Sequence, residues 1–545
     1  MSNIIYLIDL KVSDKSMTKA VKMGKTSATG SFQLFVGKSI SSIILALSSI
    51  IVGIYILQGE YGLYTIALVP STIFLLFQDW GIGPALIRNC AKYRAAKKEG
   101  ELRNVIVTGL AFEAATGLVL TLLLLLTASF MASTIYGKPE STFLIAISSI
   151  TIMSSAIYVG CDSIFVGFER MKFSTIALIV SAIIQGLLSS LLVYLGLGAF
   201  GAVVGYTLGS LVSAVTAVLM LYFGIFRKIP SQNPNRKKFL QTLKPLLQYG
   251  LPLSISTILG AVPIQLNYFI MGASVDTPSI GNFRIAFNFH VLTQFFVWPI
   301  FTVLFPAFSK LNPSKDKKLL KTVFESSVKY SSIFLVPVIM AIAVLSTPLI
   351  ETMFGDKWAT APLFLSLYVL DGLMVLLGRM SFNRLLFATG ETKILMKLNA
   401  LKLCLGLPFA FFLIPPLGII GVIITGYILG LPSAIIGIIW TWKHYEAKAD
   451  FRNSGRIFLA SVIAALTTFL LLNMFVAAAW IMLTVGAIFF LLVYLICIPL
   501  VGAINKNDIN NLRNMLSGLG VISRLLEILL TPIEKILRII KKVMG

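Results

Sequence analysis

The sequence predicts an all-α integral membrane protein of about fourteen transmembrane helices, with two six-helix bundles around a central cavity and an extra C-terminal helix pair. Of its 545 residues, 57% are hydrophobic and 12% are charged, whereas soluble domains are about half apolar and about a quarter charged. Apolar stretches near the ~20 residues that span a bilayer recur throughout, and lysine and arginine gather in alternate loops. This composition excludes a soluble enzyme, a soluble binding module and a disordered chain.

The apolar stretches give the individual helices. Many contain glycine or proline, which membrane helices tolerate better than soluble ones do. We expect helices at residues 31–57, 62–87, 104–133, 142–166, 173–195, 199–225, 249–272, 280–307, 326–348, 359–383, 394–413, 417–441, 457–477 and 480–502.

Basic residues give the topology. With the N-terminus taken as cytoplasmic, 39 of the 45 lysine and arginine residues fall in cytoplasmic segments, and only Lys138 and Lys357 fall in outside loops. Because these residues collect in cytoplasmic loops, we expect a multi-pass protein of a plasma or inner membrane with both termini cytoplasmic. The net charge of +23 then reflects topology and contact with the anionic inner leaflet, and no nucleic acid partner is predicted.

An internal repeat gives the two bundles. GLYTIAL at Gly62–Leu68 resembles GNFRIAF at Gly281–Phe287, an offset of 219 residues, and a glycine and tyrosine pattern within residues 198–209 recurs within 418–430. Six helices per copy make the repeat parallel, and transporters of this kind bind substrate between their repeats. Chance similarity between glycine-rich membrane helices stays open as the alternative.

The domains follow from the helices and the repeat. For the last of them two alternatives stay open, because an amphipathic basic helix lies either on the inner leaflet or against the cytoplasmic ends of the bundles. We expect a cytoplasmic basic N-terminus at 1–30, an N-terminal bundle at 31–226, a cytoplasmic basic linker at 227–248, a C-terminal bundle at 249–442, helices 13 and 14 within 443–502, and a cytoplasmic amphipathic basic tail at 503–545.

The sequence shows no catalytic motif. His290 and His444 are the only histidines, and the four cysteines are scattered, so neither a metal site nor a cofactor is predicted. The GKT and GKS triplets lack the upstream glycine of a P-loop. We therefore expect a protein that is not an enzyme and whose driving force comes from elsewhere, with H⁺ and Na⁺ as the candidate coupling ions.

Ionisable residues at membrane depth are the candidate functional residues, because they are costly there and usually face a bundle interior or a cavity. Cations in such a place suit a phosphate or pyrophosphate; a structural role stays open for each, as for Lys38 pairing with Asp79 or Arg284 reaching outward. The candidates for substrate phosphate are Lys38, Arg284, Arg379 and Lys402, and those for ion coupling or charge balance are Asp79, Glu113, Asp162 and Asp371.

Four segments resemble polysaccharide and O-antigen flippases, which share the multidrug/oligosaccharidyl-lipid/polysaccharide exporter superfamily with lipid II flippases. They are GEYGLYTIAL at Gly59–Leu68, DWGIGPALIRN at Asp79–Asn89, GFERMKF at Gly167–Phe173 and YGLPLSIS at Tyr249–Ser256. The resemblance implies alternating access in a V-shaped pair of bundles, and a polyisoprenyl-(pyro)phosphate-linked oligosaccharide that moves from the inner to the outer leaflet.

The same resemblance bears on particular residues. Cations on helices 1 and 8 of related flippases meet the lipid phosphate, and Lys38 and Arg284 lie on those helices here. The extra helix pair resembles the lipid-tail groove of lipid II flippases, whereas many O-antigen flippases stop at twelve helices.

Three functions stay open. The first is a lipid-linked oligosaccharide flippase for cell-surface polysaccharide or glycan assembly, with glycosyltransferases or a polymerase as candidate partners. The second is a cation-coupled multidrug or toxin exporter of the same fold. The third is a non-transporting membrane scaffold that docks glycosyltransferases through its basic loops.

Overall fold

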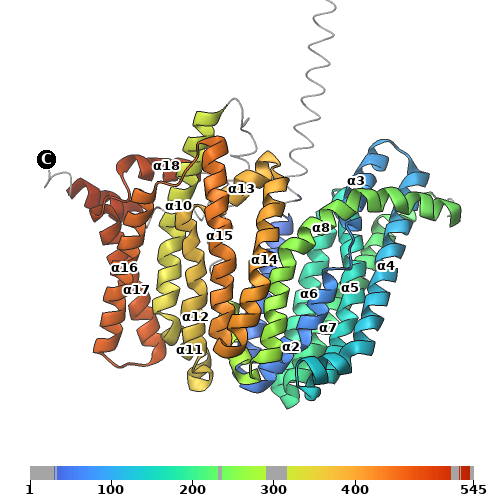
Figure 1. Ribbon diagram of the computed structural model, residues 1–545, viewed down its shortest axis with the longest axis horizontal. Helices are drawn as coiled ribbons and strands as arrows, with labels where there is room; N and C mark the ends of the chain where they lie inside the picture. The colour runs from blue at the N-terminus through green and yellow to red at the C-terminus, as the bar shows by residue number, and fades with distance from the viewer. Residues whose placement is uncertain are drawn as a thin grey trace, which may run out of the picture. The chain divides into compact units, whose positions relative to one another are not determined.

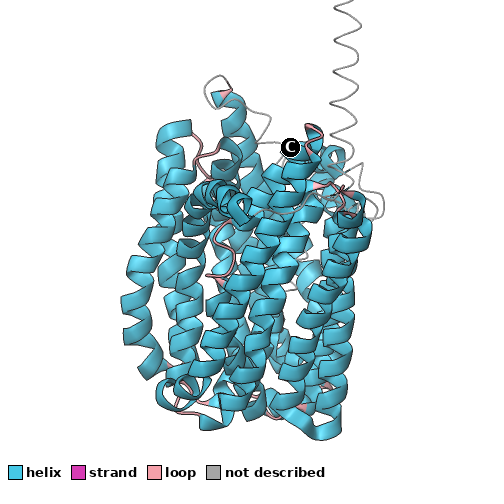
Figure 2. Ribbon diagram, turned by 90° about the vertical axis from the view of Figure 1, so that its right-hand side faces the viewer, coloured by secondary structure: helices cyan, strands magenta, loops and turns pink. Residues whose placement is uncertain are grey.

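The computed structural model describes residues 30, 33–230, 236–289, 316–516, 527 and 530–539. Across these residues the chain forms helices joined by loops and turns, and no strand occurs among them (Figure 2). The predicted all-α class is therefore confirmed. His290, Gly518 and nearly all of the basic N-terminus lie outside the described residues.

The helices have the length and composition of membrane spans. In the described part of the chain, nine are long and apolar enough to cross a membrane, or up to eleven if each of two bent helix pairs counts as one span. One of the nine, Met171–Lys228, contains two helices separated by a turn at Gly196, whose φ is +85°. The total of fourteen and the repeat remain predictions.

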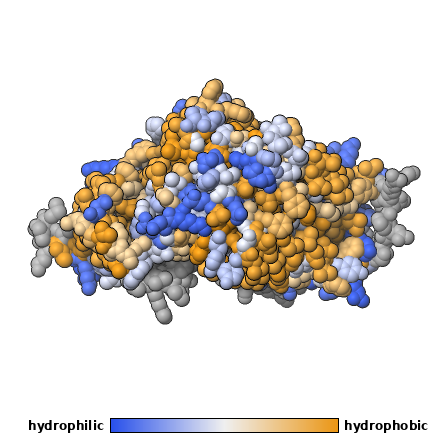
Figure 3. All heavy atoms as spheres, turned by 90° about the horizontal axis from the view of Figure 1, so that it is seen from below, coloured by the Kyte–Doolittle hydropathy of each residue, from blue (hydrophilic) through white to orange (hydrophobic). Residues whose placement is uncertain are grey.

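Large apolar side chains are exposed along these helices. Leu126, in the helix Glu99–Phe130, is 81% exposed, and Met474 is 82% exposed. A soluble protein rarely exposes a continuous apolar surface. On the face shown in Figure 3, hydrophobic residues cover most of the surface and hydrophilic residues form smaller patches. Such helices are solvated by lipid, so the protein is a multi-span membrane protein.

The chain divides into two compact units, Met1–Ala273 and Ser274–Gly545, called units 1 and 2 below. The division differs from that of the predicted bundles, which remain a prediction. Unit 1 contains the helix Gln33–Tyr55, α2 (Gln58–Leu75), α3 (Ile82–Ala95), α4 (Glu99–Phe130), α5 (Thr142–Gly167), α6 (Met171–Leu192), α7 (Gly198–Gly224) and α8 (Arg236–Ser274).

A break separates α2 from α3 inside the predicted span 62–87. Trp80 and Gly81 have φ values of +48° and +79°, a left-handed conformation that ends a helix. The Asp79 carboxylate then accepts a 2.6 Å hydrogen bond from the backbone N–H of Gly83 in the first turn of α3. This polar cap accounts for Asp79 at the break.

Gly81 also lies against Gly250 of α8. A Cβ on Gly81 would stand 2.1 Å from the Gly250 carbonyl oxygen, and a Cβ on Gly250 would stand 2.3 Å from the Gly81 carbonyl oxygen. Only glycine fits at both positions, so the backbones of the break and of α8 are in direct contact.

Unit 2 begins with a helix over residues 277–289. Figure 1 shows α16 and α17 running beside α10 at the C-terminal end of this unit. The remaining helices are α10 (Lys317–Val344), α11 (Ser346–Phe354), α12 (Ala361–Val369), the 3₁₀ helix η6 (Leu370–Leu377), α13 (Arg379–Thr389), α14 (Thr392–Leu417), α15 (Ile419–Tyr445), α16 (Phe451–Met474), α17 (Ala479–Leu500) and α18 (Lys506–Leu516).

The start of the basic tail, α18, is docked on α10. Lys329 Nζ lies 2.6 Å from Asp508 Oδ2, and the two side chains are 20% and 9% exposed. Asp508 also accepts a hydrogen bond from the backbone N–H of Asn505, while Ile509 and Leu512 are buried. Of the two alternatives for the tail, the structure therefore shows the docked helix over α18.

Candidate functional site

The candidate site in unit 2 forms where the predicted span 359–383 breaks. The 3₁₀ helix η6 ends at Gly378, whose φ is +85°, and α13 starts at Arg379. The helices on the two sides of this glycine are bent by 59°. A glycine is needed here because other residues rarely adopt this conformation.

The break brings Asp371 and Arg379 together. Arg379 donates through Nη1 to Asp371 Oδ1 at 3.0 Å and through Nη2 to Asp371 Oδ2 at 2.8 Å. This is a bidentate ion pair, the geometry in which guanidinium and carboxylate match best. The two side chains are 35% and 33% exposed, so the pair is only partly covered by protein.

Lys402 of α14 and Tyr427 of α15 complete the Arg379 cluster, defined as Asp371, Arg379, Lys402 and Tyr427. The Lys402 ammonium is half-buried and interacts electrostatically with both Arg379 and Asp371. The Tyr427 hydroxyl donates to the Leu367 carbonyl, which fixes its ring beside the pair. The cluster thus contains two basic side chains and one carboxylate.

Gly430 of α15 has no side chain, and this makes room for the Arg379 guanidinium. A Cβ at this position would lie 2.9 Å from Arg379 Nη1 and 3.2 Å from Asp371 Oδ1. This approach is closer than real Cβ atoms make, so a side chain here displaces the guanidinium.

We expect Gly430→Ala to lower substrate transport about tenfold, because losing one charge-assisted hydrogen bond costs about 1.5 kcal/mol. Gly426→Ala is the matched control, since it lies on the same helix and a Cβ there meets nothing within 4 Å. Transport by reconstituted protein checks both variants. Equal rates for the two variants would contradict the assigned role of Gly430.

The other predicted site residues are not members of the Arg379 cluster. In unit 1, Lys38 is exposed, and its charge interacts with Asp162 of α5. Asp79 interacts with Glu113 of α4, which is 0% exposed. In unit 2, the Arg284 guanidinium carbon lies 5.9 Å from the centre of the Phe287 ring.

The described residues contain no group of three or more histidine, cysteine, aspartate or glutamate side chains that could hold a metal ion. The basic side chains of the Arg379 cluster can bind and orient an anion.

A family model described as polysaccharide biosynthesis protein matches residues 56–362 of the chain. This is more than half of the chain. The chain belongs to the polysaccharide biosynthesis protein family. The family resemblance predicted from the sequence is thereby confirmed.

Two relatives of this chain are also described as biosynthesis proteins. Lipopolysaccharide biosynthesis protein WzxC of Escherichia coli (strain K12) is 25% identical over 353 residues, covering 64% of this chain and 67% of that protein. Teichuronic acid biosynthesis protein TuaB of Bacillus subtilis (strain 168) is 23% identical, covering 54% of this chain and 58% of that protein.

Two solved structures share the fold of this family member. The lipid II flippase MurJ matches with a TM-score of 0.69 at 16% identity, over 85% of this chain and 97% of that one. An inward-facing multidrug resistance MATE family transporter of the MOP superfamily matches with a TM-score of 0.61 at 18% identity, over 76% of this chain and 98% of that one.

Sequence reasoning missed two members of the site in this polysaccharide biosynthesis protein. Tyr427 and Gly430 belong to the repeated glycine and tyrosine pattern, but neither was a site candidate. Their spacing to each other is visible in the sequence, whereas the contacts of Tyr427 with Leu367 and of Gly430 with Arg379 join α15 to residues about 50 or more positions earlier.

Proposed function

We propose that the protein flips a polyisoprenyl-(pyro)phosphate-linked oligosaccharide from the cytoplasmic to the outer leaflet by alternating access, with both termini cytoplasmic. The observation that carries the proposal is the meeting of two basic side chains, Arg379 and Lys402, with a single carboxylate in a member of a polysaccharide biosynthesis family. A cation at membrane depth is costly unless a partner anion meets it.

The depth of the cluster fits a lipid phosphate in transit. Asp371 follows the start of α12 at Ala361 by ten residues, a rise of roughly 15 Å at about 1.5 Å per residue. Because this is half of a hydrocarbon core about 30 Å thick, we propose that the cluster lies near the middle of the bilayer. A phosphate crossing there loses its hydration, and Lys402 and Arg379 would replace the lost water with charge-assisted hydrogen bonds.

Unit 1 offers a site for the coupling ion. Asp79 and the buried Glu113 form a carboxyl pair at the break between α2 and α3. We propose that this pair carries a proton during the transport cycle, because two adjacent carboxyls, one of them buried, are stable together when one is protonated.

A multidrug or toxin exporter is the second candidate. The shared MATE fold and the buried carboxyl pair favour it, since organic cations need acids in the binding site. The positive charge of the Arg379 cluster favours the flippase instead. A scaffold that docks glycosyltransferases would need no charged cluster at membrane depth.

Reconstituted protein tests the proposal. Liposomes would contain a polyisoprenyl pyrophosphate that carries one N-acetylhexosamine with a dithionite-sensitive fluorophore on its sugar. We expect the protein to raise the dithionite-accessible fraction above the half that protein-free liposomes show. A fluorescent phosphatidylcholine is the control and should not move.

The possible outcomes separate the candidates. Movement of phosphatidylcholine at the same rate would mean unselective lipid scrambling and would contradict the proposal. Proton- or sodium-driven movement of an organic cation such as ethidium, without movement of the lipid pyrophosphate, would identify the exporter. Movement of neither would leave the scaffold.

A further inference from the structure

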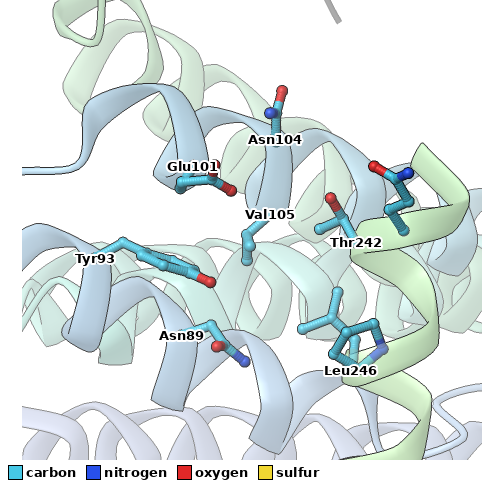
Figure 4. A pocket seen from close by; sticks show the side chains of 9 residues that line it. Asn89, Tyr93, Glu101, Asn104, Val105, Thr242 and Leu246 are labelled. Atoms are coloured by element: carbon cyan, nitrogen blue, oxygen red, sulfur yellow. The ribbon is translucent and has the colours of Figure 1, made fainter. Parts of the chain in front are cut away.

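A polar pocket lies in unit 1, away from every charged residue discussed above. It is formed where α3, α4 and the first turns of α8 meet (Figure 4), at the end of the unit where the segments 88–103 and 227–248 are predicted to be cytoplasmic. Its lining residues are Asn89, Tyr93, Glu101, Asn104, Val105, Gln241, Thr242, Pro245 and Leu246.

The pocket has room for one small ring. Its volume is about 200 Å³, the space of six or seven liquid waters at about 30 Å³ each. This is less than the about 300 Å³ at which pockets for drug-sized ligands start. It is large enough for a single sugar ring.

The charge of the lining argues against a phosphate ligand. None of the nine lining residues is a cation, and Glu101 contributes a carboxylate. Of the cations around the pocket, Arg103 stacks on Phe226 at 4.3 Å and donates to the Ile229 carbonyl, and Arg88 lies 4.5 Å from the Tyr249 ring centre. Lys92 Nζ lies 5.6 Å from the ring centre of the lining Tyr93. Within the lining itself the one charged side chain is an acid, which favours a neutral ligand over an acidic one.

The polar groups of the lining match the hydroxyls of a sugar. Figure 4 shows the Tyr93 hydroxyl and the Glu101 carboxylate directed into the same space. Asn104 is 8% exposed and contributes both a donor and an acceptor. Because Lys92 lies 5.6 Å from the Tyr93 ring centre, that phenol offers its hydroxyl more than a stacking face.

Pro245 adds a backbone acceptor. Proline has no N–H, so it cannot donate to the carbonyl of Gln241 one turn earlier, and both residues line the pocket. The side chains and backbone together provide several acceptors and donors around a space the size of one ring, which is the arrangement that a polyhydroxylated ligand requires.

We propose that this pocket binds one neutral, glycosidically linked sugar ring of the substrate headgroup on the side where the substrate loads. The inference rests on the proposed flippase function and adds to it a second contact point, separate from the phosphate. It also predicts a preference: neutral hexoses and N-acetylhexosamines enter the pocket, and uronic acids are repelled by Glu101.

Saturation-transfer NMR on the full chain in lipid nanodiscs tests the inference, with the methyl glycosides of glucose, N-acetylglucosamine and glucuronic acid as probes. We expect transfer to the two neutral glycosides and not to the glucuronide. Asn104→Leu should weaken binding of the neutral glycosides about tenfold through lost hydrogen bonds. Glu101→Gln should admit the glucuronide, and since Glu101 is exposed, this variant should fold.

Glu99→Gln is the matched control, because Glu99 lies in the same first turn of α4 and does not line the pocket. Equal effects of the Glu99 and Glu101 variants, or equal transfer to wild type and Asn104→Leu, would overturn the inference. If glycosides do not bind while the lipid pyrophosphate still moves, the pocket inference alone is wrong. If glycosides bind and nothing moves, the proposed function alone is wrong.

Discussion

Replacing Arg379 by methionine is expected to lower transport of the labelled lipid pyrophosphate about 100-fold. The guanidinium would supply two charge-assisted hydrogen bonds to the phosphate, and their loss at about 1.5 kcal/mol each accounts for this factor. The dithionite assay with reconstituted protein measures it. Arg384→Met is the control, because Arg384 lies on the same helix, α13, outside the cluster.

A second variant separates binding from a structural role. Asp371→Asn removes the carboxylate that pairs with Arg379 and keeps the guanidinium. If Arg379 binds the phosphate, Asp371→Asn should retain binding of the lipid pyrophosphate, whereas Arg379→Met should lose it. If the ion pair only holds the helix break together, both variants should lose transport to a similar extent, and the phosphate role of Arg379 would be rejected.

Asp508→Ala should release the tail helix α18. Removing one partner of a buried ion pair leaves an uncompensated charge, which costs about 3–5 kcal/mol, and Lys329 is largely buried beside Asp508. We expect a lower thermal unfolding midpoint in detergent and faster proteolysis after residue 500. Lys321→Ala, an exposed position on the same helix α10, should change neither.

The double variant Lys329→Met with Asp508→Leu tests the cause. Apolar replacement of both partners of a buried pair is often neutral, so most of the lost stability should return. The remaining loss, about 1 kcal/mol, is that of the helix cap, because Asp508 also accepts from the Asn505 N–H. A double variant as unstable as Asp508→Ala alone would refute the ion pair as the source.

Hydropathy and charge were sufficient to predict the helical membrane fold and to select Arg379, Lys402 and Asp371. They were not sufficient to predict that these three meet. Asp371 and Arg379 are eight residues apart, which is roughly 12 Å along a straight helix, so the predicted unbroken span 359–383 separates them. The bend at Gly378 brings them into contact, and its left-handed backbone was not readable from apolar length.

The other charged pairs show a second limit. Similar depths in neighbouring helices made pairing of Lys38 with Asp79 one open alternative, and the structure adds an interaction of the Lys38 charge with Asp162. Depth can be counted from a sequence, whereas the direction in which a side chain points depends on helix rotation and packing. The docking of α18 has the same origin, since Lys329 and Asp508 are 179 residues apart.

The contact between Gly81 and Gly250 constrains the polar pocket between α3, α4 and α8. Two backbones in van der Waals contact leave no side chain that could change rotamer and absorb a displacement. The backbone contact therefore fixes the distance between α3 and α8 close to the wall that carries Asn89 and Tyr93. Leu86 of α3, Leu102 of α4 and Leu246 of α8 lie in one buried core, so the three walls of the pocket are also joined beneath it and its width is set before any ligand arrives.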